Sequence, residues 1–287
     1  MTRRIIAPLV LLALTVASFG ERAHAREDEV TPAKVERHVD IPKAAEKDFA
    51  ERVVAEITDG SLELVVDPTI DAPTVDVEFT VDGADDKDVK RRAEVVRLFA
   101  ERSSDQSVVV QVVYPGKAMP RDSAKVKITV PRCGDSSLRS TKGAITAIKT
   151  AGKLRVKSKE GAIKVDRNDG SVEVNGGKGA IDVVGANAEV RVSGGAGKVT
   201  VTMADANDLP FEVEAKGGAI RVEVGAAFDG VVKMHTTSGE IEFTDGSKSA
   251  RMPTSTEHSK TVEIGAAGGH SEIRTTTGAI ELVVRSK

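Results

Sequence analysis

A short phrase that recurs at a fixed spacing is the feature that most constrains the fold of this chain. The phrase is glycine, one further residue, and then isoleucine or valine. Its early copies are 18 residues apart and the next are 21 apart; they begin at Gly143, Gly161, Gly179, Gly197, Gly218 and Gly239, and a last copy begins at Gly278. Repeats of this kind are typical of architectures in which each unit buries its apolar face only by stacking on its neighbours.

Within each unit, side chains alternate between two faces, as they do along a β-strand. In one copy Ile163 and Val165 lie on one face and Lys164 lies on the other. A second series, nine residues after the early copies, has the same alternation, as at Val172 and Val174. The sequence therefore predicts an all-β protein, a parallel β-solenoid or β-helix with 18–21-residue rungs. We expect the glycines to open each strand at a tight turn, often with φ above zero.

The outward charged residues support this spacing. It predicts one file of Arg155, Glu173, Arg191, Glu212 and Lys233, and the neighbouring pairs Lys164 with Asp182 and Arg221 with Glu242. Opposite charges side by side on a sheet contribute about 0.2–1 kcal/mol each. The alternation of charge sign therefore favours this register. It is evidence for the structure and not for any function.

Two other repeat folds with turns of similar length are excluded. A left-handed hexapeptide helix needs an apolar residue at every sixth position, but Asp169 and Asn175 follow Ile163 at that spacing. Calcium-binding β-rolls carry a repeated Gly-Gly-x-Gly-x-Asp turn. The turns over 166–169 and 184–187 share no repeated carboxylate, so a calcium site of that kind is not expected.

The region before the repeats, 49–134, is predicted to be rich in strands and to continue or cap the solenoid. Alternation predicts strands within 52–57 and 61–66, joined as a hairpin at Asp59-Gly60, and further strands over 74–81, 107–114 and 125–131. Apolar residues at three- and four-residue steps predict one α-helix over 84–102, with acidic residues at its N-terminal end. Residues 135–287 form the solenoid, with a loop over 245–260.

The first 25 residues resemble a secretory signal peptide. Arg3 and Arg4 precede an apolar run, and Ala23-His24-Ala25 is a small-x-small cleavage site. The run is too short and too interrupted to span a bilayer. We therefore predict signal cleavage, a mature chain with no transmembrane span, and a location in the periplasm, the cell envelope or the exterior. Residues 26–48 are charged and irregular, and are predicted to be a flexible leader with one strand near 38–41.

The composition limits which partners are expected. The chain has 41 basic and 44 acidic residues, which are interspersed along it, so nucleic acid is not an expected partner. Its single cysteine, Cys133, cannot form an internal disulfide. With no tryptophan and one tyrosine, the chain lacks the aromatic platforms usual in sites that cleave polysaccharides.

No set of residues has the spacing of a catalytic, cofactor-binding or metal-binding site. The histidines of the mature chain are scattered, at His38, His235, His258 and His270. No Gly-x-Ser-x-Gly nucleophile turn is present. A groove could gather Asp166, Asp169 and Asp182, and Cys133 could be a reactive thiol, but structural roles are favoured for all four. We therefore predict no catalytic, cofactor or metal residue.

The repeats also carry a family resemblance. The Gly-x-Ile phrases, the preceding strand Lys127-Ile128-Thr129-Val130-Pro131 and the closing Thr276-Thr277-Gly278-Ala279-Ile280 resemble those of the DUF4097 family, exported bacterial repeat proteins described as candidate adhesins. The resemblance covers about Val53 to Val284. It implies a β-solenoid or β-helix, a location in the cell envelope or exterior, and no assigned enzymatic activity. It brings no functional residues with it.

These features favour an exported, non-enzymatic β-solenoid that acts as an adhesin or a cell-envelope scaffold. One alternative is a polysaccharide-active enzyme on the same β-helix scaffold. Another is an envelope structural protein that assembles with itself through the solenoid ends. The expected partners are therefore a cell-surface component, a glycan, an envelope protein or a second copy of the chain.

Overall fold

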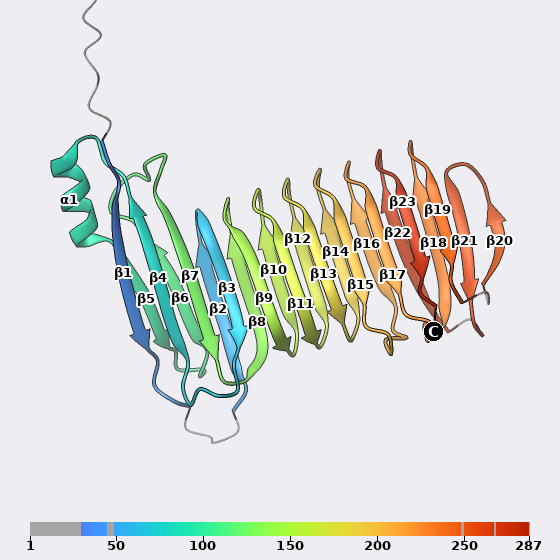
Figure 1. The fold of residues 1–287 in the computed structure, drawn as a ribbon, viewed down its shortest axis with the longest axis horizontal. Helices are drawn as coiled ribbons and strands as arrows, with labels where there is room; N and C mark the ends of the chain where they lie inside the picture. The colour runs from blue at the N-terminus through green and yellow to red at the C-terminus, as the bar shows by residue number, and fades with distance from the viewer. Residues whose placement is uncertain (1–29, 45–48, 248–249, 267, 287) are drawn as a thin grey trace, which may run out of the picture.

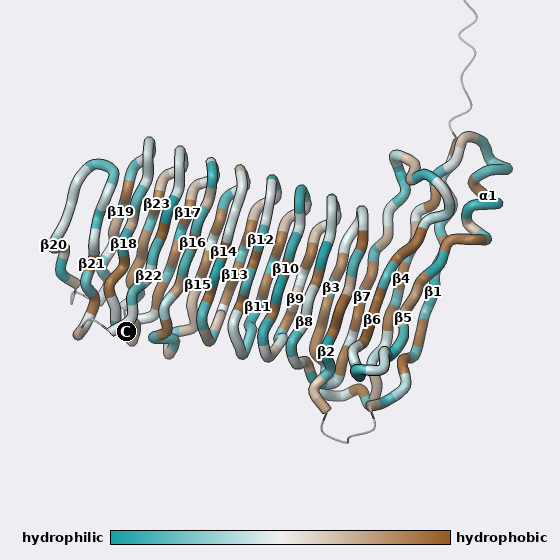
Figure 2. Tube along the Cα trace, turned by 180° about the vertical axis from the view of Figure 1, so that it is seen from behind, coloured by the Kyte–Doolittle hydropathy of each residue, from teal (hydrophilic) through white to brown (hydrophobic). Residues whose placement is uncertain are grey.

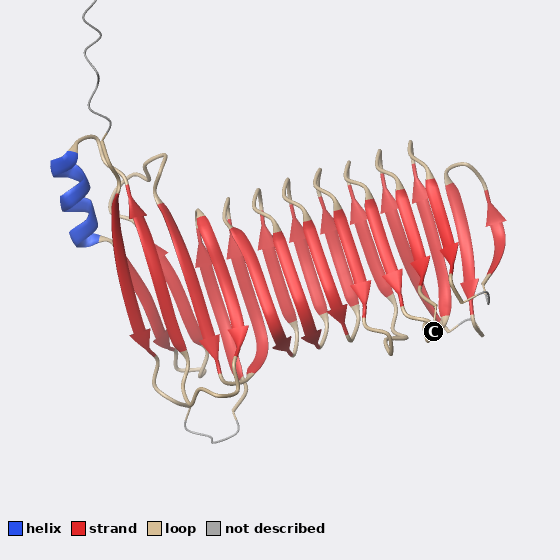
Figure 3. Cartoon of the chain, viewed as in Figure 1, coloured by secondary structure: helices blue, strands red, loops and turns tan. Residues whose placement is uncertain are grey.

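Two large sheets make up nearly all of the described chain (Figures 1 and 3). The computed structural model describes residues 30–44, 49–247, 250–266 and 268–286. The predicted signal peptide and part of the predicted leader lie outside these residues. No helix in the described residues is long and apolar enough to cross a membrane.

Sheet A has 11 strands, parallel except at its first two pairings. In spatial order they are β1 (Ala33–Asp40), β4 (Thr74–Val81), β7 (Ser123–Val130), β3 (Gly60–Val66), β9 (Ala144–Ala151), β11 (Ile163–Asp169), β13 (Ile181–Ala186), β15 (Val199–Met203), β17 (Ile220–Val224), β23 (Ile280–Val284) and β19 (Ile241–Asp245).

Sheet B has 12 strands and is also mostly parallel. From the same end they are β5 (Arg97–Arg102), β6 (Val108–Val113), β2 (Glu51–Ile57), β8 (Cys133–Ser140), β10 (Leu154–Ser158), β12 (Val172–Gly176), β14 (Val190–Gly194), β16 (Phe211–Ala215), β22 (Gly269–Thr275), β18 (Gly230–Thr236), β21 (Ser259–Ile264) and β20 (Arg251–Ser255).

From β8 to β17 the chain alternates between the two sheets, and the predicted 18-residue register is confirmed. Ile163 is the direct neighbour of Ile145 on one side and of Ile181 on the other. Along each strand, apolar and polar residues alternate (Figure 2). The inward file of sheet A is almost fully buried; it comprises Leu62, Ile145, Ile163, Ile181, Val199, Ile220, Ile280 and Ile241. Aliphatic burial between the sheets, at about 25 cal/mol per Å², is therefore what holds the stack together.

The recurring glycines are required by close approach of stacked turns and not by left-handed φ values. A Cβ on Gly161 would lie 2.0 Å from the carbonyl oxygen of Gly143, and one on Gly179 would lie 2.2 Å from that of Gly161. The glycines with positive φ are others, such as Gly152 and Gly185. The prediction of positive φ for the phrase glycines was therefore wrong. Glycine is needed at these positions because turns stacked about 4.8 Å apart leave no room for a side chain.

The C-terminal strand pair does not stack last. β22 lies between β16 and β18, and β23 lies between β17 and β19. Glu281 therefore separates Arg221 from Glu242, and Glu272 separates Glu212 from Lys233. Those two predicted neighbour pairs are wrong, whereas the earlier pairs of the file and Lys164 with Asp182 are confirmed.

At the other end, β2 and β3 belong to different sheets, so the predicted hairpin is wrong. The chain turns from sheet B to sheet A at Asp59-Gly60, where Gly60 has φ 110°. A Cβ on Gly60 would lie 2.1 Å from the carbonyl oxygen of Ala124. The turn is therefore a corner between sheets, and the β2–β3 pair lies between β6–β7 and β8–β9.

The only helix in the described residues is α1 (Asp86–Val95), which is shorter than the predicted 84–102. Asp85 caps it by accepting a hydrogen bond from the backbone N–H of Asp88 at 2.7 Å. Val96 is already extended, with ψ 136°. Residues 97–102 form β5 instead, because antiparallel pairing with β6 satisfies the backbone and turns Leu98 toward the core.

Two further stretches differ from the prediction: the leader strand is longer and lies earlier than the predicted 38–41, and the predicted loop over 245–260 contains a strand. The leader contains the eight-residue strand β1, which pairs antiparallel with β4. Within the predicted loop over 245–260, residues 251–255 form β20, which pairs antiparallel with β21 and ends sheet B. Both lie at the ends of the stack, where there is no repeat period to reveal a strand.

Candidate functional site

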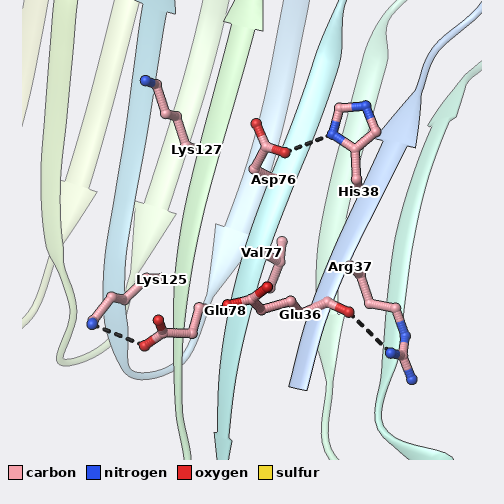
Figure 4. Close-up of a pocket in the computed structure, with 8 residues that line it drawn as sticks. All are labelled: Glu36, Arg37, His38, Asp76, Val77, Glu78, Lys125 and Lys127. Carbon is pink, nitrogen blue, oxygen red and sulfur yellow. Dashed lines mark hydrogen bonds and ion pairs between the residues drawn. The ribbon is translucent and has the colours of Figure 1, made fainter. Parts of the chain in front are cut away.

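The outer face of sheet A is hollowed where β1, β4 and β7 lie side by side (Figure 4). The depression has a volume of about 490 Å³ and is lined by Glu36, Arg37, His38, Asp76, Val77, Glu78, Lys125 and Lys127. Antiparallel register brings these side chains together: His38 is opposite Asp76, and Asp76 is in turn opposite Lys127. The site is thus assembled from three strands far apart in the sequence.

His38 is held between two carboxylates. Its Nδ1 lies 2.6 Å from Asp76 Oδ1, and its Nε2 lies 3.2 Å from Asp40 Oδ1. The hydrogen bond to Asp76, and then that to Asp40, raises the pKa of His38 above its ordinary value. Protonation lets both ring nitrogens donate at once, which explains the direction of the shift.

A second ion pair closes the other side of the depression. Lys125 Nζ donates to Glu78 Oε1 at 2.9 Å, and Lys34 Nζ lies 3.6 Å from the same oxygen. The hydrogen bond from Lys125 lowers the pKa of the Glu78 carboxyl below its ordinary value. Acidic and basic groups in this depression therefore compensate each other locally.

The chemistry that this depression supports is binding of a polar ligand. None of its eight lining residues is a serine, threonine or cysteine, so no hydroxyl or thiol nucleophile lines it. Both ring nitrogens of His38 are already engaged by carboxylates. In the part of the chain that the structure describes, no group of three or more histidine, cysteine or acidic side chains is placed to hold a metal ion.

The three carboxylates considered from the sequence form separate interactions. Asp166 Oδ1 lies 3.1 Å from Arg167 Nε, and Asp169 Oδ1 accepts a hydrogen bond from Asn187 Nδ2 at 3.1 Å. Asp182 is the sheet neighbour of Lys164. A depression of about 420 Å³ near these strands is lined by Asp169 but by neither of the other two. The structure therefore does not bring the three into one groove.

The remaining residues that the sequence singled out also lie apart. Cys133 is buried, its Sγ lies 3.3 Å from Ser136 Oγ, and burial raises the pKa of its thiol. His235 and His270 are exposed on β18 and β22, and His258 lies in the turn between β20 and β21. Of the histidines considered, the structure gives His38 the most developed polar surroundings. The sequence feature that could have pointed to His38 is Asp40, which follows it by two positions and therefore lies on the same face of the strand.

The family of the chain follows from its repeats. A family model described as a domain of unknown function, DUF7330, matches residues 135–278, about half of the chain. The chain belongs to the DUF7330 family. The DUF7330 match extends from β8 to the turn before β23. This match is to DUF7330 and not to DUF4097, so membership of the DUF4097 family stays a prediction.

The chain is similar to several solved structures, among them proteins from three bacteria. The chain is 11% identical to a candidate adhesin from Bacteroides fragilis, with a TM-score of 0.43 over 87% of this chain and 97% of that one. It is 14% identical to a candidate adhesin from Parabacteroides distasonis, with a TM-score of 0.35 over 87% of this chain and 97% of that one. It is 12% identical to a candidate cell adhesion protein from Clostridium sporogenes, with a TM-score of 0.32 over 89% of this chain and 100% of that one. Such low TM-scores establish no function for this DUF7330 protein, and no curated protein matches it.

Proposed function

We propose that this DUF7330 protein is an exported, non-enzymatic β-solenoid that serves as an adhesin or as a scaffold in the cell envelope. The observation that carries the proposal is the stacking of strand pairs from β2 to β23 into one body with two broad outer faces. Such a body offers an extended surface for a partner. Stacked repeats commonly use their extended surfaces in this way.

Three observations support a solenoid in particular. Successive strands from β8 to β17 alternate between sheets, each strand pair lies parallel to the one before, and the phrase glycines pack against each other from turn to turn. A chain that winds in this way buries a continuous aliphatic core at every turn. The same winding explains why isoleucine and valine make up most of the interior.

The absence of enzymatic activity is supported by the state of the polar groups. In the depression over β1, β4 and β7, acid and base are paired with each other, and none of the lining residues is a serine, threonine or cysteine. Asp166 and Asp169 are likewise bound to neighbouring side chains. Catalytic acids and bases need groups that converge on a substrate, and within the described residues these groups converge on one another.

Two measurements test the proposal. Residues 1–25 fused to a reporter that is active only outside the cytoplasm should yield activity, and an Arg3→Glu, Arg4→Glu signal should yield much less. The labelled mature chain should then sediment with envelope fractions of the source cells and not with their cytosol. Release of new reducing ends from envelope glycans, or failure to bind any envelope fraction, would contradict the proposal.

A further inference from the structure

One strand of sheet B presents only basic side chains to solvent. Along β10 and the turn after it, Leu154, Val156 and Ser158 are buried. The residues between and beside them point outward, and we call them the β10 row: Lys153, Arg155, Lys157 and Lys159. Alternation along a strand repeats every two residues, so these four side chains line one face.

The neighbouring strand adds to this charge. Arg139 of β8 is the direct sheet neighbour of Lys157. Like charges side by side on a sheet are destabilising. Further along the same face the signs alternate, since Glu173 lies between Arg155 and Arg191. The β10 row therefore departs from the pattern that stabilises the rest of this face.

Acidic neighbours compensate only part of the row. Glu173 Oε2 lies 3.4 Å from both Lys153 Nζ and Arg155 Nε. Among the described residues, no carboxylate lies within ion-pair distance of Arg139, Lys157 or Lys159. Three exposed cations are thus left together without a structural role.

We propose that the β10 row and Arg139 bind a linear anionic polysaccharide that lies along β10. This names the partner class of the adhesive function proposed above and rests on that function. Outward residues along a strand are about 6.6 Å apart, so β10 offers Arg155 and Lys157 at that spacing, and Lys153 and Lys159 flank them at the two ends of the strand. A chain with regularly spaced carboxylates can meet several of them at once, and each exposed contact contributes modestly.

The shape of the charge pattern favours a chain over a membrane surface. Carboxylates flank the row on both sides: Glu56 is the sheet neighbour of Arg139, and Glu173 is that of Arg155. A planar anionic membrane would also meet these carboxylates, whereas a single polymer chain need not. β8 and β12 contain no aromatic residue. Bases of single-stranded nucleic acid bind by stacking on aromatic side chains, so this surface does not suit them.

The test compares two double variants of the mature chain. Arg139→Gln with Lys157→Gln, the row variant, removes one cation from β8 and one from the β10 row. Lys164→Gln with Lys198→Gln removes two exposed charges from the outer face of sheet A and is the matched control. Calorimetric titration with polygalacturonate should give binding that weakens at high salt. The row variant should bind about tenfold more weakly than the wild type, and the control should bind like the wild type.

Stability provides a second measurement that separates binding from folding. Because the row variant loses a like-charge pair, its urea midpoint should equal or exceed that of the wild type. Equal binding by both variants, equal binding to neutral dextran, or a row-dependent preference for phosphatidylglycerol vesicles or oligothymidine would overturn the inference. If the wild type and the row variant adhere equally to envelope fractions, the inference fails and the proposed function stands. If the wild type adheres to none, the proposed function itself fails.

Discussion

At the scale of single residues, the glycine phrase makes a sharp prediction. Gly161→Ala should lower the free energy of unfolding by about 3 kcal/mol, because its Cβ would lie 2.0 Å from the carbonyl oxygen of Gly143. Gly217→Ala is the control, since its Cβ would approach nothing more closely than Thr277 Oγ1 at 3.4 Å. Urea denaturation of both variants measures the difference. Similar midpoints for the two variants would contradict the role of close approach.

His38 makes the docking of β1 depend on pH. Its pKa is raised in the folded chain by hydrogen bonds to Asp76 and Asp40. Protonation therefore stabilises the fold fully below the unfolded pKa of about 6.5, and this contribution is lost as the pH rises through the folded pKa. Backbone amides of β1, corrected for intrinsic exchange rates, should be better protected from hydrogen exchange at about pH 6 than at about pH 8.

His38→Gln is the matched control for that measurement. Glutamine keeps a polar side chain on β1 but does not titrate, so the protection of β1 should lose most of its pH dependence. The amides of β11 should respond equally in the two proteins, because β11 lies beyond β7, β3 and β9 in sheet A. A β1 whose protection follows pH equally in both proteins would show that other groups control its docking.

At the scale of the elements, the inserted C-terminal strand pair links the two strand pairs on either side of it. Leu282 is fully buried, and β23 is hydrogen-bonded to both β17 and β19. Leu282→Ala should therefore cost about 3 kcal/mol and speed hydrogen exchange in β17 and β19 together. Met252→Ala on the exposed strand β20 should change stability by less than about 0.5 kcal/mol. Faster exchange confined to β23 would contradict this linkage.

At the scale of the whole molecule, the C-terminal end of the stack is protected against edge-to-edge pairing. Strand β20 ends sheet B and contains Pro253, which has no N–H to donate. Strand β19 ends sheet A, and Lys260 Nζ donates to the Ile241 carbonyl at 2.5 Å. Proline and lysine at sheet edges are common protections against association.

Removing both protections should promote association of the chain with itself. We expect the wild type to sediment as a monomer, and Pro253→Val with Lys260→Ala to form larger species as its concentration rises. Lys233→Ala, on the outer face of the inner strand β18, removes a lysine without touching an edge and should stay monomeric. A wild type that already forms end-to-end polymers would favour a self-assembling envelope protein instead.

The sequence predicted most of the central stack. Alternation at Ile163 and Val165 and the 18-residue step are local properties, and backbone geometry alone turns them into strands with a known inward face. The helix was predicted too long because Val89, Ala93, Val96 and Ala100 recur at helical steps, whereas Val96, Leu98 and Ala100 also alternate as in a strand. Pairing of β5 with β6 settled that ambiguity, and such pairing is not a local property.

The candidate site could not have been predicted from the chain alone. His38 and Asp76 meet only because β1 pairs with β4 in one particular register. Cys133 and the three carboxylates over 166–182 carried more chemical promise in the sequence, yet Cys133, Asp166 and Asp169 each contact a neighbouring side chain, and Asp182 is the sheet neighbour of Lys164. The sequence showed which side chains could do chemistry, but it did not show which of them come together in space.

The strands of the central stack and the order of the strand pairs at its ends therefore have different origins. The sequence by itself determined the strands, their inward residues and the step from one strand pair to the next, because periodicity dictates which side chains must be buried. Only the tertiary structure decided the order of the stack at its ends, where β23 separates β17 from β19 and β2–β3 precedes β8–β9. Strand pairs with nearly the same apolar pattern can stack on one another in many orders. The choice among those orders depends on long-range contacts that no local pattern encodes.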